Sequence, residues 1–270
     1  KVEARLKADT GRDIRGVLLV HNETATGVTH PVAEVRKAID RAGHPALFLS
    51  DTISSLGSME YKMDAWGIDV TIAGSQKGLM LPTGLAMTGV SAKAMEVARK
   101  AKLPKYYFNW ELMASRKPQR FNGTVPVHFF FGLQESIKLI EEETLEGVFA
   151  RHARLAEATR ACVRAWSADG KGPSLFGQTE ERLSNSVTTI MMPEGHTSDA
   201  MRKTALERFN LSLGGGLGPL MGKVFRIGHL GDLNEPMLLG CLATTELAMK
   251  TVGIPFAPGG VDAAIKSLAN

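Results

Sequence analysis

The sequence predicts an α/β fold, with a mostly parallel sheet flanked by helices and followed by a smaller α+β domain. Through the first hundred residues, short apolar runs alternate with stretches of helical periodicity, as in a sheet built from β-α-β units. Polar or glycine-rich segments follow several of these runs, and the alternation changes character in the second half of the chain. We therefore expect a large domain over residues 1–145 and a small C-terminal α+β domain over residues 146–270.

The first domain contains four apolar runs of strand length. They cover residues 17–20, 46–49, 68–73 and 85–90. Between the first two runs, Pro31 stands where a helix would begin and Gly43 where it would end, because proline is tolerated in the first helical turn and glycine favours the C-terminal cap. A further helix is expected from Ser91.

Helical periodicity dominates the middle of the chain, and mixed signals follow it. Residues 125–166 predict two helices with a bend near Gly147. Beyond them, strands are expected at 186–192 and 224–227 and helices at 198–209 and 235–252. Such a mixture is typical of a small α+β domain.

Composition and charge argue against two classes of partner. The 32 Lys and Arg are interleaved with 28 Asp and Glu, and only 6% of the residues are aromatic, so we expect no nucleic-acid partner. The net charge of +4 suits a small anionic ligand. No apolar run has the length of a transmembrane helix, so no membrane partner is expected. Cys162 and Cys241 lie in apolar helical patterns without a metal or disulfide spacing, which favours a cytoplasmic location.

Three strands of the predicted sheet end in polar clusters. These clusters are residues 21–26, 51–55 and 75–77. Ligands of open α/β sheets bind beyond the carboxyl ends of the strands. Lys77, between Gly74 and Gly78, can act as an amine nucleophile if partly desolvated, and it equally fits a solvated loop lysine. Asp51 fits either a turn carboxylate or a partner for a protonated ring nitrogen.

Arg226 lies within an apolar strand pattern of the second domain. A buried arginine needs an anionic partner, so it fits either a structural ion pair or the bidentate capture of a substrate carboxylate. The glycine cluster at 214–218 matches neither the dinucleotide-binding motif nor the P-loop, because Pro219 and Val224 stand where glycine and Ser or Thr belong. We expect a substrate-side loop or plain turns there.

Four sequence blocks occur in a specific order and span nearly the whole chain. They are HNETATGV at 21–28, DTISSLG at 51–57, GIDVTIAGSQKGL at 67–79, and GGLGP followed by GKVFRIG at 215–228. With these blocks the chain resembles the class-V, fold-type I pyridoxal-phosphate (PLP) aminotransferases of the alanine–glyoxylate and serine–glyoxylate group.

The resemblance implies a role for individual residues. Lys77 would hold PLP as a Schiff base, Asp51 would pair with the pyridinium nitrogen, and Arg226 would bind the substrate α-carboxylate. The other cofactor contacts that it implies are Thr24, Ile53, Gln76 and Thr124. Thr124 falls in segment 118–126, which would reach across a homodimer to the partner's phosphate. Phe121 replaces a tyrosine of the alanine–glyoxylate members, which removes one hydroxyl from that contact.

The implied reaction transfers an amino group from an amino acid to glyoxylate, with the Lys77 amine moving the proton of the substrate Cα. Asn22 and Thr26 resemble the serine–glyoxylate members, so L-serine is the expected donor, giving hydroxypyruvate and glycine. Alanine, aspartate and ureidoglycine are alternative donors. Cysteine desulfurases share the fold but require a thiol on a mobile loop, which neither cysteine provides.

One departure concerns the start of the chain. Members of the resembled family carry roughly a third of their length ahead of the first block, whereas here the block begins at His21. The chain is therefore expected to be N-terminally incomplete. A cofactor-free, non-enzymatic fragment is the second alternative.

Overall fold

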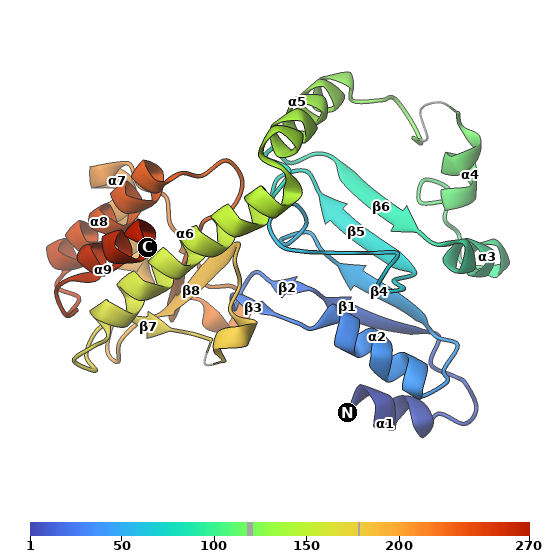
Figure 1. Cartoon of the computed structure of the whole chain (residues 1–270), viewed down its shortest axis with the longest axis horizontal. Helices are drawn as coiled ribbons and strands as arrows, with labels where there is room; N and C mark the ends of the chain where they lie inside the picture. Colours follow the sequence, from blue (N-terminus) through green and yellow to red (C-terminus); the bar gives the residue numbers. More distant parts are fainter. Residues whose placement is uncertain (118–120, 178) are drawn as a thin grey trace. The chain divides into compact units, whose positions relative to one another are not determined.

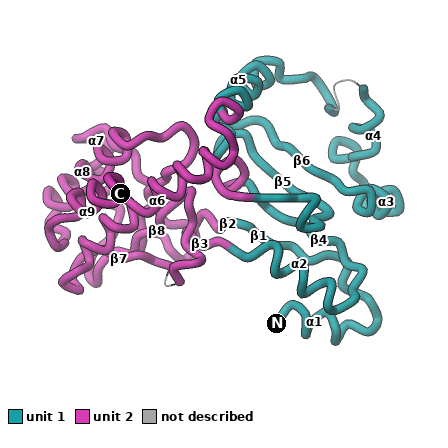
Figure 2. Tube along the Cα trace, in the orientation of Figure 1, with its two compact units in different colours: residues 1–21, 30–53, 61–139 teal, residues 22–29, 54–60, 140–270 magenta. Residues whose placement is uncertain are grey.

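A computed structural model describes residues 1–117, 121–177 and 179–270, and the chain divides into two compact units (Figure 1, Figure 2). Unit 1 contains residues 1–21, 30–53 and 61–139. Unit 2 contains residues 22–29, 54–60 and 140–270. The segments 22–29 and 54–60 follow strands of unit 1 in sequence but belong to unit 2.

Unit 1 is built on a four-stranded sheet of order β1-β4-β5-β6. Its strands are β1 (Gly16–Val20), β4 (Leu47–Asp51), β5 (Val70–Gly74) and β6 (Ala86–Val90). The first three are parallel, and β6 pairs with β5 in the antiparallel sense. The prediction of a mostly parallel sheet with flanking helices is confirmed.

Unit 1 also contains helices, only some of which begin at a capping side chain. They are α1 (Val2–Lys7), α2 (Val32–Arg41), α3 (Ala92–Lys100), α4 (Trp110–Ser115) and most of α5 (Val127–Glu143). Pro31 occupies the N-cap of α2, and the Ser91 hydroxyl caps α3 by accepting a hydrogen bond from the Ala94 amide at 3.1 Å. Ile39 of α2 packs on Phe48 of β4, and both side chains are fully buried.

Unit 2 combines helices with an antiparallel sheet of order β7-β8-β10-β9. The sheet strands are β7 (Ser174–Leu175), β8 (Val187–Met191), β9 (Gly214–Gly215) and β10 (Val224–Gly228). The helices are α6 (Leu145–Trp166), α7 (Ser198–Phe209), α8 (Glu235–Val252) and α9 (Gly260–Ala269), with 3-10 turns at Glu180–Arg182 and Gly218–Leu220. A separate hairpin is formed by β2 (Asn22–Glu23) and β3 (Val28–Thr29).

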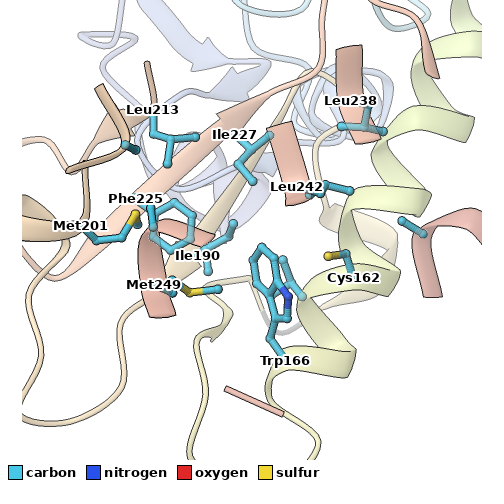
Figure 3. Close-up of a cluster of buried hydrophobic side chains, with 14 of the residues drawn as sticks. Cys162, Trp166, Ile190, Met201, Leu213, Phe225, Ile227, Leu238, Leu242 and Met249 are labelled. Atoms are coloured by element: carbon cyan, nitrogen blue, oxygen red, sulfur yellow. The ribbon is translucent and has the colours of Figure 1, made fainter. Parts of the chain in front are cut away.

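The core of unit 2 lies between this sheet and its helices (Figure 3). Trp166 at the end of α6 is fully buried, and Ile190 of β8, Phe225 of β10 and Met249 of α8 surround it in one cluster. Its indole Nε1 donates to Glu246 Oε1 at 2.8 Å, which satisfies the one polar atom of the side chain. This packing gives β10 a fixed support on one face.

The break between α5 and α6 lies at Thr144, so the predicted bend near Gly147 is wrong by three residues. Thr144 has a φ of +69°, and its hydroxyl accepts a hydrogen bond from the Gly147 amide at 3.2 Å. Gly147 therefore lies in the first turn of α6, and an N-cap threonine rather than a glycine separates the two helices. The Arg151–Glu143 ion pair, at 2.7 Å, joins α6 back to the end of α5.

Part of the glycine cluster forms a strand rather than a loop or plain turns. Gly214 and Gly215 pair with Arg226 and Phe225 of β10 as the short edge strand β9.

Within the described ranges, no helix is long and apolar enough to span a membrane. Among the same residues, no group of three or more His, Cys, Asp or Glu side chains is placed to hold a metal ion.

Candidate active site

Asp51 and Lys77 follow neighbouring parallel strands of unit 1 at the same edge of the sheet. Asp51 is the last residue of β4 and lies opposite Ile72 of β5, and Lys77 follows the end of β5 by three residues. Asp51 Oδ1 accepts a hydrogen bond from the Ile53 amide at 2.9 Å, which turns the chain directly after the strand. The two residue types singled out from the sequence are thus both placed beyond the carboxyl ends of adjacent strands.

Both side chains are half-buried. Among the described residues, the Lys77 amine makes no hydrogen bond or ion pair, and the Asp51 carboxylate has no cationic partner. A carboxylate and an amine held in this state at one sheet edge are available to a ligand.

Ser75 holds the turn that carries Lys77, and sequence reasoning assigned no role to it. Its buried hydroxyl donates to the Pro82 carbonyl at 2.7 Å and accepts from the Leu85 amide at 3.2 Å. The Leu81 amide donates to the Ser75 carbonyl at 3.0 Å. The turn is therefore tied to the start of β6 by side-chain and main-chain bonds. In the sequence, only the place of Ser75 between Gly74 and Lys77 could have indicated this supporting role.

Gly74 marks a close approach between Ile53 and Gln76. A Cβ atom on Gly74 would lie 2.8 Å from Gln76 Oε1 and 3.4 Å from Ile53 Cγ2. The Gln76 side chain is exposed and that of Ile53 is half-buried. The structure therefore brings these two predicted site residues together over the end of β5, where a methyl group on residue 74 would require the exposed Gln76 side chain to move.

Arg226 and Thr24, both of unit 2, are joined through the main chain of Thr24. Arg226 Nη1 donates to the Thr24 carbonyl oxygen at 3.1 Å, and its Nε donates to the Gly215 carbonyl oxygen at 2.8 Å. In the part of the chain that the structure describes, Arg226 has no carboxylate partner within ion-pair distance, and the Thr24 hydroxyl makes no hydrogen bond.

The pKa of Arg226 lies below its usual value. Burial is the largest cause and the nearby positive charge of Arg202 adds to it, while Glu23 acts in the opposite direction. A half-buried guanidinium that lacks a carboxylate gains from binding an anion. Of the two interpretations left open by the sequence, the geometry disfavours a structural ion pair.

A buried polar cluster in unit 2 joins the segments 22–29 and 54–60 to each other and to Ser186. Asn22 Nδ2 donates to Ser54 Oγ at 2.9 Å and to Ser186 Oγ at 3.1 Å. Ser54 Oγ donates to the Asn22 carbonyl and Ser186 Oγ to the Ser54 carbonyl, each at 2.7 Å. Because both hydroxyl protons are used, the hydroxyls can only accept from Asn22, which sets its amide orientation. Asn22 lies two residues before Thr24, and Ser54 directly follows Ile53, so both are close in sequence to predicted site residues. Ser186 gave no signal in the sequence.

The predicted segment 118–126 is described only from Phe121 onward, because residues 118–120 lie outside the described residues. Thr124 is exposed and Phe121 is half-buried. The Asn122 side chain nearby donates to the Tyr107 carbonyl at 2.8 Å.

The two cysteines lie inside helices, Cys162 in α6 and Cys241 in α8. Burial raises the pKa of the Cys162 thiol far above its usual value and that of Cys241 to about 11. Neither thiol forms the thiolate needed for nucleophilic attack. Chemistry at a cysteine, as in the desulfurases, finds no support here.

The chain is similar to known proteins in both sequence and fold. The family described as aminotransferase class-V matches residues 3–217. The chain is 46% identical over 99% of its length to the serine–glyoxylate aminotransferase of Methylorubrum extorquens, and 47% identical over 98% to the L-aspartate–glyoxylate aminotransferase of Paracoccus denitrificans. It spans 67% and 66% of these relatives, or about two thirds of their length.

Among solved structures, the ureidoglycine–glyoxylate aminotransferase from Bacillus subtilis superposes with a TM-score of 0.87 at 27% identity, over 100% of this chain and 69% of that one. Fold and sequence thus place the chain in the class of fold-type I, PLP-dependent aminotransferases. Within that class, it belongs to the class-V aminotransferase family.

Proposed function

We propose that the protein catalyses PLP-dependent transfer of an amino group from an amino acid to glyoxylate, with L-serine as donor and hydroxypyruvate and glycine as products. The similarity to a serine–glyoxylate enzyme at 46% identity supports the reaction class. The single observation that carries the proposal is the half-buried Arg226 guanidinium, which is oriented by two main-chain carbonyls. Both proposed substrates bear a carboxylate that such a guanidinium binds.

The residues of unit 1 fit the cofactor of this family. Asp51 would hold the proton of the pyridinium nitrogen, and Lys77 would hold the cofactor covalently. Their position at one sheet edge supports this assignment. In unit 2, Thr24 is a further proposed cofactor contact, and its hydroxyl has no partner among the described residues.

When bound, PLP supplies an electron-withdrawing ring that stabilises negative charge at the substrate Cα. The protein's own part is to move protons and to orient groups. The Lys77 amine would take the proton from Cα and return it, because a neutral amine is a base of suitable strength. Asp51 would keep the ring nitrogen protonated, and Arg226 would orient the substrate through its carboxylate.

The amino donor is tested by direct competition. The 47% identity to an aspartate–glyoxylate relative favours L-aspartate as a second candidate, and alanine and ureidoglycine are further members of the panel. Steady-state kcat/KM with glyoxylate as acceptor should be highest for L-serine. A higher value for aspartate would replace serine as the donor. Turnover with none of them would favour the cofactor-free alternative.

We further propose a cytoplasmic homodimer, with a large domain over residues 1–145 and a small one over 146–270. The exposed Thr124 supports a role in contacting the phosphate of a partner subunit. Light scattering of the full chain, together with a Thr124→Ala variant, tests this arrangement. A monomer with full activity would contradict it.

A further inference from the structure

Two arginines contact opposite faces of the glycine strand β9. In a strand, successive residues face opposite sides. A Cβ on Gly214 would lie 3.1 Å from Arg226 Cβ, and a Cβ on Gly215 would lie 2.8 Å from Arg202 Nη1. Gly214 therefore faces Arg226 of β10, and Gly215 faces Arg202 of α7.

Arg202 lies on helix α7 and contacts β9 and the residue before it. Its Nε donates to the Leu213 carbonyl at 3.0 Å, one residue before the strand. Its guanidinium lies over Gly215, where any larger residue would displace it. The only carboxylate near it among the described residues is that of Asp199, at 3.7 Å and largely exposed, so this ion pair adds little.

The strand that Arg202 holds is the one that orients Arg226. The Gly215 carbonyl accepts from Arg226 Nε at 2.8 Å, and β9 is the edge of its sheet, supported by β10 alone. A two-residue edge strand made of glycine has little stability of its own. A contact from outside the sheet therefore helps to hold its carbonyl in place.

We propose that Arg202 is a positioning residue for Arg226. Arg202 holds β9 in place, and the Gly215 carbonyl then fixes the plane of the Arg226 guanidinium for carboxylate binding. This inference rests on the proposed role of Arg226 in substrate binding. The positive charge of Arg202 also disfavours the free cation at Arg226, which increases the gain when a carboxylate binds.

The first readout reports on Arg226 without any turnover. In the full chain with its cofactor, labelled with 15N-arginine, hydrogen exchange of the Arg226 Nε–H is followed by NMR and assigned by its loss in Arg226→Lys. We expect Arg202→Gln to accelerate this exchange about tenfold or more, since the bond to Gly215 loses its support. Arg202→Lys, which can still donate to Leu213, should restore part of the protection. Lys203→Gln, the neighbouring exposed cation on α7, is the matched control for lost charge.

The second readout is kinetic. Arg202→Gln should raise KM for both the donor and glyoxylate about tenfold with kcat changed far less, as a misaligned charge-assisted contact predicts. Gly215→Ala serves if Arg202→Gln does not fold, because its added methyl displaces the Arg202 guanidinium and leaves the arginine in the chain.

Four results test the proposal. Faster exchange with a raised KM supports the proposal. Unchanged exchange in the folded variant overturns it, and so does a KM that stays constant in Arg202→Gln while Arg226→Lys raises it. Faster exchange with KM unchanged in both Arg202→Gln and Arg226→Lys supports the positioning by Arg202 and refutes the carboxylate role of Arg226.

Discussion

The Arg226 guanidinium donates to the main-chain carbonyl oxygen of Thr24 at 3.1 Å, although the two residues are 202 positions apart in sequence. The contact uses the backbone of Thr24, so the hydroxyl of that residue stays available for another partner. The orientation of Arg226 therefore depends on the path of segment 22–29 and not on the identity of residue 24. Substitutions at the two positions should have separable effects.

Replacing Arg226 by lysine keeps the charge and removes the planar fork that binds a carboxylate at two points. We expect KM for both substrates to rise roughly 10- to 100-fold, which corresponds to the loss of a charge-assisted contact. Thr24→Ala should leave KM nearly unchanged and weaken cofactor retention. Steady-state kinetics against the exposed control Arg208→Lys checks both. A drop in melting temperature with unchanged KM would identify Arg226 as a structural residue.

Gly74→Ala places a methyl group 2.8 Å from Gln76 Oε1. The Gln76 side chain is exposed and its end can move, so the unfolding free energy should change by less than about 1 kcal/mol. PLP affinity, measured by fluorescence titration, should nevertheless fall, because the methyl group displaces Gln76, a proposed cofactor contact. Gly240→Ala, in helix α8 with nothing near its Cβ, is the control and should keep its affinity. Equal affinities in the two variants would show that the position of Gln76 does not affect cofactor binding.

Ser186 connects the segments 22–29 and 54–60 to β8. Ser186→Ala removes the donor to the Ser54 carbonyl and one acceptor of the Asn22 amide, so two buried groups lose partners. Both groups keep the bonds between Asn22 Nδ2 and Ser54, so the unfolding free energy should drop by about 0.5–1.5 kcal/mol per lost hydrogen bond. Urea denaturation measures it, with the exposed Ser212→Ala as reference. A loss no larger than that of Ser212→Ala would show that the cluster contributes nothing to holding the segments.

His229 is fully buried, and its pKa is lowered to about 3, chiefly by burial. Its Nδ1 bonds the Asn185 carbonyl at 3.0 Å, so that nitrogen carries the proton and Nε2 accepts from the Thr188 hydroxyl at 2.8 Å. The unfolded chain binds a proton below about pH 6.5, whereas the folded chain does not until near pH 3. Stability from this group is therefore complete above pH 6.5 and is lost as the pH falls below it.

The expected slope is up to about 1.4 kcal/mol of unfolding free energy per pH unit below pH 6.5. The pKa values of His21 and His152 are lowered by burial as well, so they add to the same trend. Urea denaturation between pH 7.5 and 5, followed by Trp166 fluorescence in a Trp66→Phe, Trp110→Phe background, should show a smaller slope in His229→Gln. The exposed His128→Gln controls for the substitution itself. An identical slope in His229→Gln and the wild type would refute the assignment.

Most long helices and the five-residue strands could be predicted from the sequence, whereas the ten-residue helix α9 and the two-residue strands were not predicted. Helices α7 and α8 begin and end where their apolar periodicity does, and the strand ends that carry Asp51 and Lys77 follow directly from apolar runs. The edge strand β9 has two residues and no side chains, so no hydrophobic pattern in the sequence predicts it. The hairpin of β2 and β3 belongs to unit 2 although it follows β1, because Asn22 bonds Ser186, a partner 164 residues away.

The chemistry of the candidate site was predictable to a similar extent. Lys77, Asp51 and Arg226 could be singled out because a charged residue at the end of an apolar strand, or within one, requires a partner or a ligand. Ser75, Ser186 and Arg202 act by supporting other residues, and such roles depend on contacts that local sequence does not encode. The position of the break at Thr144 was missed because a glycine three residues later is the stronger local signal.

The central claim is that Lys77 carries the cofactor, and borohydride reduction followed by mass spectrometry of the denatured full chain tests it most directly. We expect a reduced pyridoxyl-phosphate adduct on the peptide that contains Lys77, and its loss in Lys77→Ala but not in Lys93→Ala. An adduct that persists in Lys77→Ala, or no adduct on a chain with the full length of its relatives, would contradict the account.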